Sequence, residues 1–146
     1  MADDTPTYDF QVTVDAAGPH ALADWWAETL GWEVEPTDAD FVRRMVAEGH
    51  ATEDQTTTHR GALVWKVGAA IRHPGLPDRR VLFQEVPEAK TVKNRLHLDV
   101  RVGAERRAAV CDALVARGAL RLHEGRQGPF AWVTLVDPEG NEFCVT

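Results

Sequence analysis

Serine is absent from the sequence, and cysteine is scarce. Without serine, no mechanism based on a serine nucleophile is available, which excludes hydrolases of the Ser-His-Asp type. The sequence also has no glycine-rich loop of the kind that cradles a phosphate group. Two cysteines, Cys111 and Cys144, are too few for a disulfide framework, and neither lies in a recognisable nucleophile motif. We therefore expect two reduced thiols in a hydrophobic core.

Long apolar runs and an excess of basic residues are absent as well. No stretch approaches the roughly 18 apolar residues needed to span a bilayer, and the acidic N-terminal segment MADDTPTYDF lacks the apolar core of a signal peptide. These features predict a cytoplasmic protein. The formal net charge of −7 argues against nucleic acid or an anionic membrane as a partner, because both require a basic surface.

Two segments show strict alternation of polar and apolar residues, FQVTVDA (10–16) and RLHLDVRV (95–102). Because a β-strand sends successive side chains to opposite faces, each segment predicts a strand with one apolar and one polar face. The polar face of the second segment carries Arg95, His97, Asp99 and Arg101. A strand that simply faces solvent would rarely align these side chains, so this face is a candidate functional surface.

The order of predicted elements is repeated along the chain. After each alternating strand comes a helix that ends near a glycine, Gly31 in the first half and Gly118 in the second, and a short strand follows. Two further strand-like segments complete each half, GALVWKVGAA and RVLFQEV in the first and FAWVTLVD and NEFCV in the second. The sequence therefore predicts two βαβββ modules, about residues 8–88 and 93–146, within one domain of residues 1–146.

Apolar spacing predicts the buried faces of the two helices. In the first, which begins at Pro19, these residues are Leu22, Trp25, Trp26 and Leu30. In the second, which runs from Gly103 to about Arg117, they are Ala108, Cys111, Leu114 and Val115.

The first module also carries an insertion at residues 37–61. Its start, TDADFVRRMVAEG, predicts a short amphipathic helix with Phe41 and Met45 inward, and its end, HATEDQTTTHRG, predicts a polar loop. A loop of this length between strands is often disordered or a lid over a site.

Three stretches carry a family resemblance, ALADWWAETLGWEV, VPEAKTVKNRLHLDV and WVTLVDPEGNEFCV. They resemble the vicinal oxygen chelate superfamily, which includes glyoxalase I, extradiol dioxygenases and bleomycin-resistance proteins, and most closely its small glyoxalase-like domain proteins. The resemblance implies an α+β fold in which two βαβββ modules form a curved mixed sheet around a cleft. The superfamily hosts many activities, so the fold alone does not specify the chemistry.

That fold implies a role for each strand face. The apolar faces would pack against helices; they are Phe10, Val12 and Val14, and Leu96, Leu98 and Val100. The polar faces would line the cleft and bind a small molecule. The expected binding residues are Gln11, Thr13, Trp65, Gln84, Arg95, Arg101 and Trp132. The alternative is a self-contained Arg–Asp–His network that fixes how the modules meet, and the fold also implies a homodimer.

The superfamily's chemistry uses a divalent ion, such as Ni, Zn, Mn or Fe, with two ligands from each module. The implied ligand positions fall on Gln11, on Gln84 or Glu85, on Arg95 and on Cys144. Arg95 cannot bind a cation, and Cys144 is unusual at its position. The ligand set Gln11, Glu85, His97 and Glu142 can be assembled only if two of the four positions shift.

Three functions follow. The first is a glyoxalase-like protein that binds a small molecule in its cleft without the family's full metal site. The alternative is a metal-dependent lyase, isomerase or dioxygenase. Without a metal, His97 and Asp99 are the expected catalytic residues, because a histidine near a carboxylate can transfer protons at neutral pH. The third is a structural module that acts through its interface.

Overall fold

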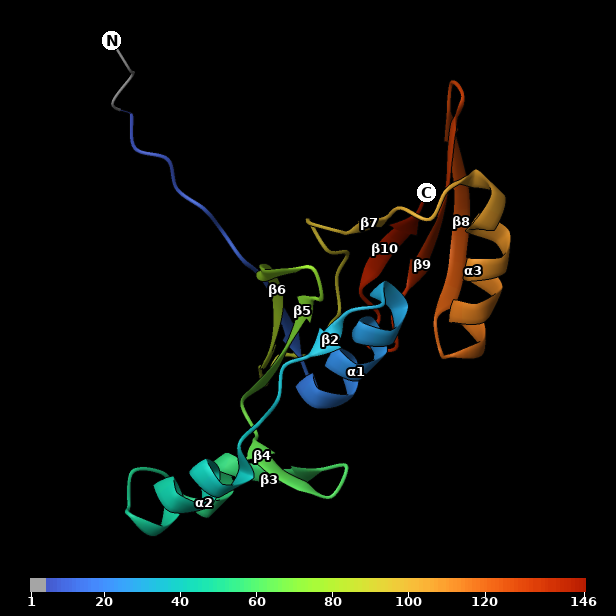
Figure 1. The fold of residues 1–146 in the computed structure, drawn as a ribbon. Helices are drawn as coiled ribbons and strands as arrows, with labels where there is room; N and C mark the ends of the chain where they lie inside the picture. The colour runs from blue at the N-terminus through green and yellow to red at the C-terminus, as the bar shows by residue number, and fades with distance from the viewer. Residues whose placement is uncertain (1–4) are drawn as a thin grey trace.

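The computed structural model describes residues 5–146 and has an α+β fold with two four-stranded sheets (Figure 1). The helices are α1 (Pro19–Leu30), α2 (Ala39–Ala47), the short 3-10 helix η1 (Glu53–Gln55) and α3 (Ala104–Ala116). The strands are β1 (Val12–Ala16), β2 (Glu33–Val34), β3 (Thr56–His59), β4 (Ala62–Trp65), β5 (Gly68–His73), β6 (Leu76–Glu85), β7 (Asp99–Val100), β8 (Leu120–Gln127), β9 (Phe130–Val136) and β10 (Glu142–Val145). Residues 1–4, which the predicted domain range includes, lie outside the described residues.

The two large sheets have the same topology. Module one is the sheet β1-β6-β5-β2 with α1, and module two is the sheet β7-β10-β9-β8 with α3. In each module the first strand pairs in parallel with the last, β1 with β6 and β7 with β10, while the other neighbours are antiparallel. This equivalence confirms the repeated βαβββ pattern.

Helix α1 contacts both modules. The rings of Trp25 and Trp26 pack edge-on against Phe143 of β10, with centroids 5.9 and 4.9 Å away. The same helix packs on β5 and β6 of its own module, and Gly31 ends it in the left-handed conformation at φ 67°. The buried hydrophobic residues form one cluster, which extends from α1 across both sheets to Cys111 and Leu114 of α3.

Several predicted boundaries and buried positions were wrong. Ladder pairing in the segment 95–102 is confined to β7, although backbone hydrogen bonds at Leu98 and Val102 continue the contact with residues 144–146 on either side of it. Phe10 and Leu96 precede the paired parts of their strands and are 86% and 90% exposed, so neither packs under a helix. In α3, Cys111 and Leu114 are buried as expected, whereas the predicted core residues Ala108 and Val115 are exposed. Both cysteines are free and buried, which confirms that prediction.

The insertion contains more regular structure than predicted. Its threonine-rich end forms β3, which pairs with β4 in a separate two-stranded sheet, because β-branched residues suit a strand. The stretch GALVWKVGAA is consequently two strands, β4 and β5, and not one. In α2 the buried residue is Val42, while Phe41 is exposed. Figure 1 shows the insertion at the end of the molecule away from β7–β10.

Among residues 5–146, no helix combines the length and hydrophobicity that crossing a membrane would require.

Candidate functional site

A cleft of about 1090 Å³ separates the first strands of the two modules. From module one it is lined by Val12, Thr13, Val14, Asp15, Ala16, Ala17, Trp26, Leu30, Ile71, Val81, Phe83 and Gln84. From the connecting segment and module two it is lined by Val86, Glu88, Ala89, Lys90, Asn94, Leu96, His97, Leu98, Asp137, Glu139, Asn141, Glu142 and Phe143. We call this cavity the intermodule cleft.

Apolar and polar groups occupy different parts of the intermodule cleft. Trp26, Phe83 and Phe143 are buried core residues and form its floor. Thr13 and Gln84 are exposed strand residues that also line the cleft, and their side chains lie on the opposite face of the sheet from Phe83. A largely apolar cavity with a few placed polar groups is the usual character of a small-molecule site.

The turn at residues 137–140 closes one end of the cleft. Asp137 is 2% exposed, and its Oδ2 accepts a hydrogen bond from Trp26 Nε1 at 3.0 Å. Its Oδ1 accepts from the backbone N–H groups of Glu139 and Asn141. The Asp137 carboxylate therefore links module two to α1.

Glu139 adds a second link between the modules. Its carboxylate accepts from the backbone N–H of Ala17 at 2.6 Å and of Gly18 at 3.1 Å, immediately before α1. Helix N-termini favour negative charge, because their first N–H groups are unpaired. Sequence reasoning predicted only a tight turn here. Two features of the sequence could have indicated these contacts with α1. They are the two acidic residues on either side of Pro138 and a core tryptophan whose N–H needs a hydrogen-bond acceptor.

Glu142 is held by the segment that connects the modules. Its carboxylate accepts from Asn94 N–H at 3.0 Å and lies 3.4 Å from Lys90 Nζ. Burial opposes ionisation of this carboxyl, but the Asn94 N–H, its own backbone N–H and the Lys90 charge together outweigh that effect and lower its pKa. Glu142 therefore serves as a charged anchor for residues 90–94.

The predicted binding residues separate into two groups. Thr13, Gln84 and His97 line the intermodule cleft, together with Glu142. Gln11, Arg95, Arg101, Trp65 and Trp132 do not. Trp65 instead lines a cavity of about 620 Å³ beside the insertion, and Trp132 lines one of about 360 Å³ near α3, where a Cβ on Gly125 would come within 2.3–2.5 Å of its ring.

The residues do not fit the four-ligand ion that the superfamily implies. Register pairs Gln84 with Asp15 and Glu85 with Ala16, so Glu85 lies on the opposite face from Gln11. The Gln11 side-chain oxygen accepts from Arg80 Nη1 at 2.9 Å. Since Glu142 is held by its own partners, no ion with two ligands from each module is assembled by the predicted set.

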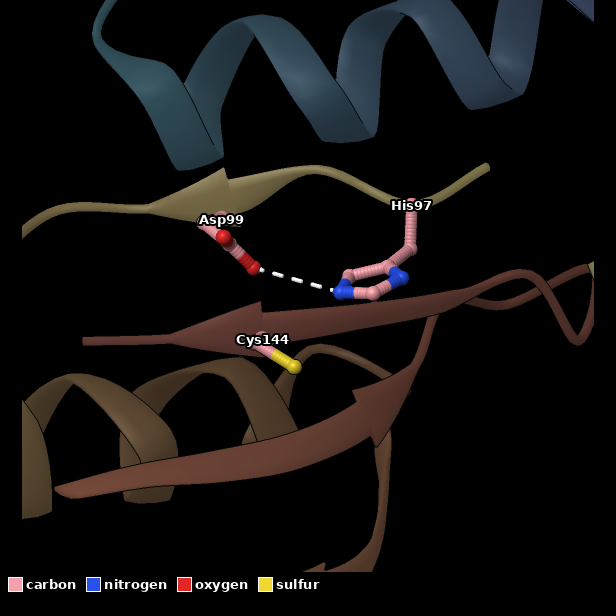
Figure 2. A group of neighbouring side chains, drawn as sticks. All are labelled: His97, Asp99 and Cys144. Atoms are coloured by element: carbon pink, nitrogen blue, oxygen red, sulfur yellow. Dashed lines mark ion pairs between the residues drawn. The ribbon is translucent and has the colours of Figure 1, made fainter. Parts of the chain in front are cut away.

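A different group of side chains gathers on module two. Figure 2 shows His97 and Asp99 on the segment that includes β7, with Cys144 on the adjacent β10. His97 Nε2 lies 3.3 Å from Asp99 Oδ1, and the potential ligand atoms of all three residues lie within 4.8 Å of one another. Cys144 Sγ is also 3.4 Å from Thr134 Oγ1. Parallel pairing places Cys144 opposite Asp99 and brings the group together.

The comparisons with known proteins agree with this fold. The sequence profile of the glyoxalase-like domain family matches residues 11–146. A search of curated protein sequences finds no significant match.

Solved structures show the same architecture at low sequence identity. One is the fosfomycin resistance protein FosX from Listeria monocytogenes, a variant complexed with Mn(II) and 1S,2S-dihydroxypropylphosphonic acid; it is 10% identical, with a TM-score of 0.62 over 97% of this chain and 92% of that one. Another is a protein described as a possible glyoxalase from Bacillus cereus, 12% identical, with a TM-score of 0.57 over 93% and 95% of the two chains. A third is the oxidase ChaP-H2, 13% identical, with a TM-score of 0.58 over 96% and 93%.

The profile match covers nearly the whole chain, and the repeated βαβββ topology agrees with it. The chain belongs to the glyoxalase-like domain family, and the three solved structures share its fold.

Proposed function

We propose that this protein binds a small organic molecule in the intermodule cleft, without the four-ligand metal site of its superfamily. The observation that carries this proposal is a cavity of about 1090 Å³ at the junction of the two modules. That volume is slightly above the roughly 300–1,000 Å³ common for ligand pockets. Its apolar floor would bury the body of the ligand, while Thr13, Gln84 and His97 would orient polar groups.

We also propose that the protein is cytoplasmic and forms a homodimer, and two exposed apolar residues support the homodimer. Phe10 and Leu96 are large apolar residues that solvent reaches, and Leu96 also lines the cleft. Covering them in a second copy of the chain would remove apolar surface from water. The net charge of −7 supports a small-molecule partner over nucleic acid or a membrane surface.

A second candidate is catalysis at the edge of the cleft. His97 and Asp99 form a close pair, and His97 lines the cavity, so a bound ligand could exchange a proton with the imidazole. The complex of FosX with Mn(II) supports metal-dependent lyase, isomerase or dioxygenase chemistry as the other form of this candidate. Both forms require His97. They predict a ligand that the wild type converts and that the His97→Gln variant does not.

Ligand binding can be tested by thermal shift against phosphonates, glycopeptide antibiotics and common metabolites. The blocking variant is Thr13→Trp, which adds a large ring at the mouth of the cleft. Thr57→Trp is its matched control, since Thr57 is also an exposed strand residue but lies outside the cleft lining. We expect a compound that stabilises the wild type and the control but not Thr13→Trp. If no compound stabilises the wild type, or if all three proteins respond equally, the proposal fails.

A further inference from the structure

We propose that the cavity between α3 and the β8–β9 hairpin binds a phosphate group, held by Arg107, Arg121 and Arg126. We call it the α3 cavity; its volume is about 360 Å³, and Figure 1 shows α3 beside β8 and β9. All three arginines line it, and among the described residues that line it Glu124 is the only acidic one. The lining therefore carries a formal excess of two positive charges, in a chain whose net charge is −7.

Strand pairing and α3 bring the three guanidinium groups together. Directly paired residues of an antiparallel ladder point to the same face, and Arg121 pairs with Leu135 while Arg126 pairs with Ala131. Leu135 is buried in the core that α3 helps to form. From α3, Arg107 Nη1 donates to the backbone carbonyl of Ala131 at 3.0 Å. The arginines therefore converge on the α3 side of the module-two sheet.

This side is the opposite of the one on which the superfamily's implied metal position falls. Cys144 pairs with Thr134 and with Asp99, and Thr134 is next to Leu135 in β9, so Cys144 and Asp99 lie across the sheet from the arginines. Within residues 5–146, the α3 cavity shares no lining residue with the intermodule cleft. The inference therefore goes beyond the proposed function, and the two can fail independently.

Most of the guanidinium donors in the α3 cavity are not used by the protein. Each arginine carries five N–H donors, and Arg107 uses one of them on a backbone carbonyl. Arg121 lies 3.5 Å from Glu124 and 3.3 Å from Asp112, which is longer than the about 2.7–2.9 Å of a close charge-assisted bond. In the part of the chain that the structure describes, no hydrogen bond or ion pair engages the Arg126 guanidinium.

A phosphate group suits these donors better than a carboxylate does. It presents at least three terminal oxygens, so three guanidinium groups can donate to it at once, whereas a carboxylate presents only two. Its charge of about −1.5 to −2 at neutral pH matches the excess positive charge of the lining. Planar guanidinium groups also bind phosphate oxygens in pairs, so the site does not need the glycine-rich loop that the sequence lacks.

The test is calorimetric titration of the full-length chain with inorganic phosphate. We expect one equivalent to bind, and Arg126→Gln to weaken the affinity about tenfold, because hydrogen bonds to charged groups are the strong ones. Glu124→Gln should instead tighten binding, since it removes the carboxylate that competes for Arg121. Arg106→Gln is the matched control, because Arg106 is an exposed residue of α3 outside the cavity lining; it should change the affinity by less than about twofold.

Failure of the wild type to bind phosphate would overturn the inference. Equal affinities of the wild type and Arg126→Gln would do the same, as would an equal loss in Arg106→Gln, because the effect would then reflect overall charge. Arg126 and Glu124 are exposed, so both variants should fold, and circular dichroism checks this. Phenyl phosphate is titrated alongside. Tighter binding than inorganic phosphate would identify an organic phosphate as the ligand, and equal or weaker binding would identify free phosphate; both results support the site.

Thr13→Trp separates this site from the intermodule cleft. Inorganic phosphate should bind this variant as tightly as it binds the wild type, because Thr13 does not line the α3 cavity. A loss of phosphate binding in Thr13→Trp would place the anion in the cleft and contradict the inference. Any cleft ligand that carries a phosphate or phosphonate group is measured in the Arg126→Gln background, where binding to the α3 cavity is weakened.

Discussion

The indole N–H of Trp26 donates to the carboxylate of Asp137 at 3.0 Å, and the two residues are 111 positions apart in the chain. The bond joins α1 of module one to the turn before β10 of module two. It lies beside the cleft, whose lining includes both residues. The shape of the candidate site therefore depends on a small number of polar contacts between the modules.

Removing the Asp137 carboxylate should destabilise the protein. Asp137→Ala would leave the buried Trp26 N–H without its acceptor, which costs about 1–3 kcal/mol, and it would also remove the acceptor of two part-buried backbone N–H groups. We therefore expect the free energy of unfolding, measured with urea, to fall by at least about 1 kcal/mol. Asp112→Ala is the control, because it breaks only an exposed pair with Arg121 and should change stability by about 0.5 kcal/mol or less. Equal effects of the two variants would contradict the role of Asp137.

Glu139 should protect the start of α1. In Glu139→Gln the charge that faces the helix N-terminus is lost, and such interactions are worth about 0.3–1 kcal/mol at exposed sites. Amide hydrogen exchange at Ala17 and Gly18 should become faster, while the amides of β9 should keep their wild-type rates. Unchanged protection at Ala17 and Gly18 would show that the carboxylate is not what shields them.

Glu142 should make stability depend on pH in the acidic range. Its pKa is lowered from the ordinary value of 4.5, so the unfolded state binds a proton more readily than the native state. The stabilisation that the ionised Glu142 carboxylate contributes is therefore present above about pH 4.5. It is lost as the pH falls through the lower pKa that Glu142 has in the native state. Urea unfolding of the wild type and Glu142→Gln between pH 3 and 7 should show a difference that shrinks on acidification. A difference that grows on acidification would reverse the assigned sign.

The insertion should loosen locally when one of its contacts with α1 is removed. Asp24 Oδ2 lies 2.6 Å from His59 Nε2 and 3.0 Å from Arg60 Nε. Asp24→Asn should speed hydrogen exchange in β3 and β4 while leaving β5 and β6 protected. Asp40→Asn is the matched control, because its pair with Arg43 is exposed and lies within α2. Faster exchange in the control as well would point to a general loss of stability instead.

Local signals in the sequence predicted much of the fold. Pro19 and Gly31 mark the ends of α1, where they lie in the structure, because first-turn prolines and left-handed glycines act within a few residues. The repeat of strand, helix and glycine was equally visible. Alternation also identified two faces on each strand, but its assignment of the cleft to the polar face was wrong in part, because Val12, Val14 and Leu98 of the apolar faces also line the cleft. Nor did it show where helix coverage stops, and Phe10 and Leu96 are exposed for that reason.

The site was harder to predict because it depends on pairing between distant segments. Alternation could not decide between Gln84 and Glu85; the register with β1 does, by pairing Gln84 with Asp15. Likewise, nothing local to Cys144 shows that parallel pairing places it opposite Asp99. The cross-module contacts of Asp137 and Glu139 also required the packing of α1 against module two.

The most direct test of the central claim is nuclear magnetic resonance mapping of any compound that stabilises the protein. Our account predicts that amide shifts on titration will concentrate on both sides of the intermodule cleft, in residues 12–17 and 96–98. Shifts confined to residues 50–67 beside the insertion, or to residues 121–133 near α3, would contradict it, because the ligand would then occupy one of the two smaller cavities.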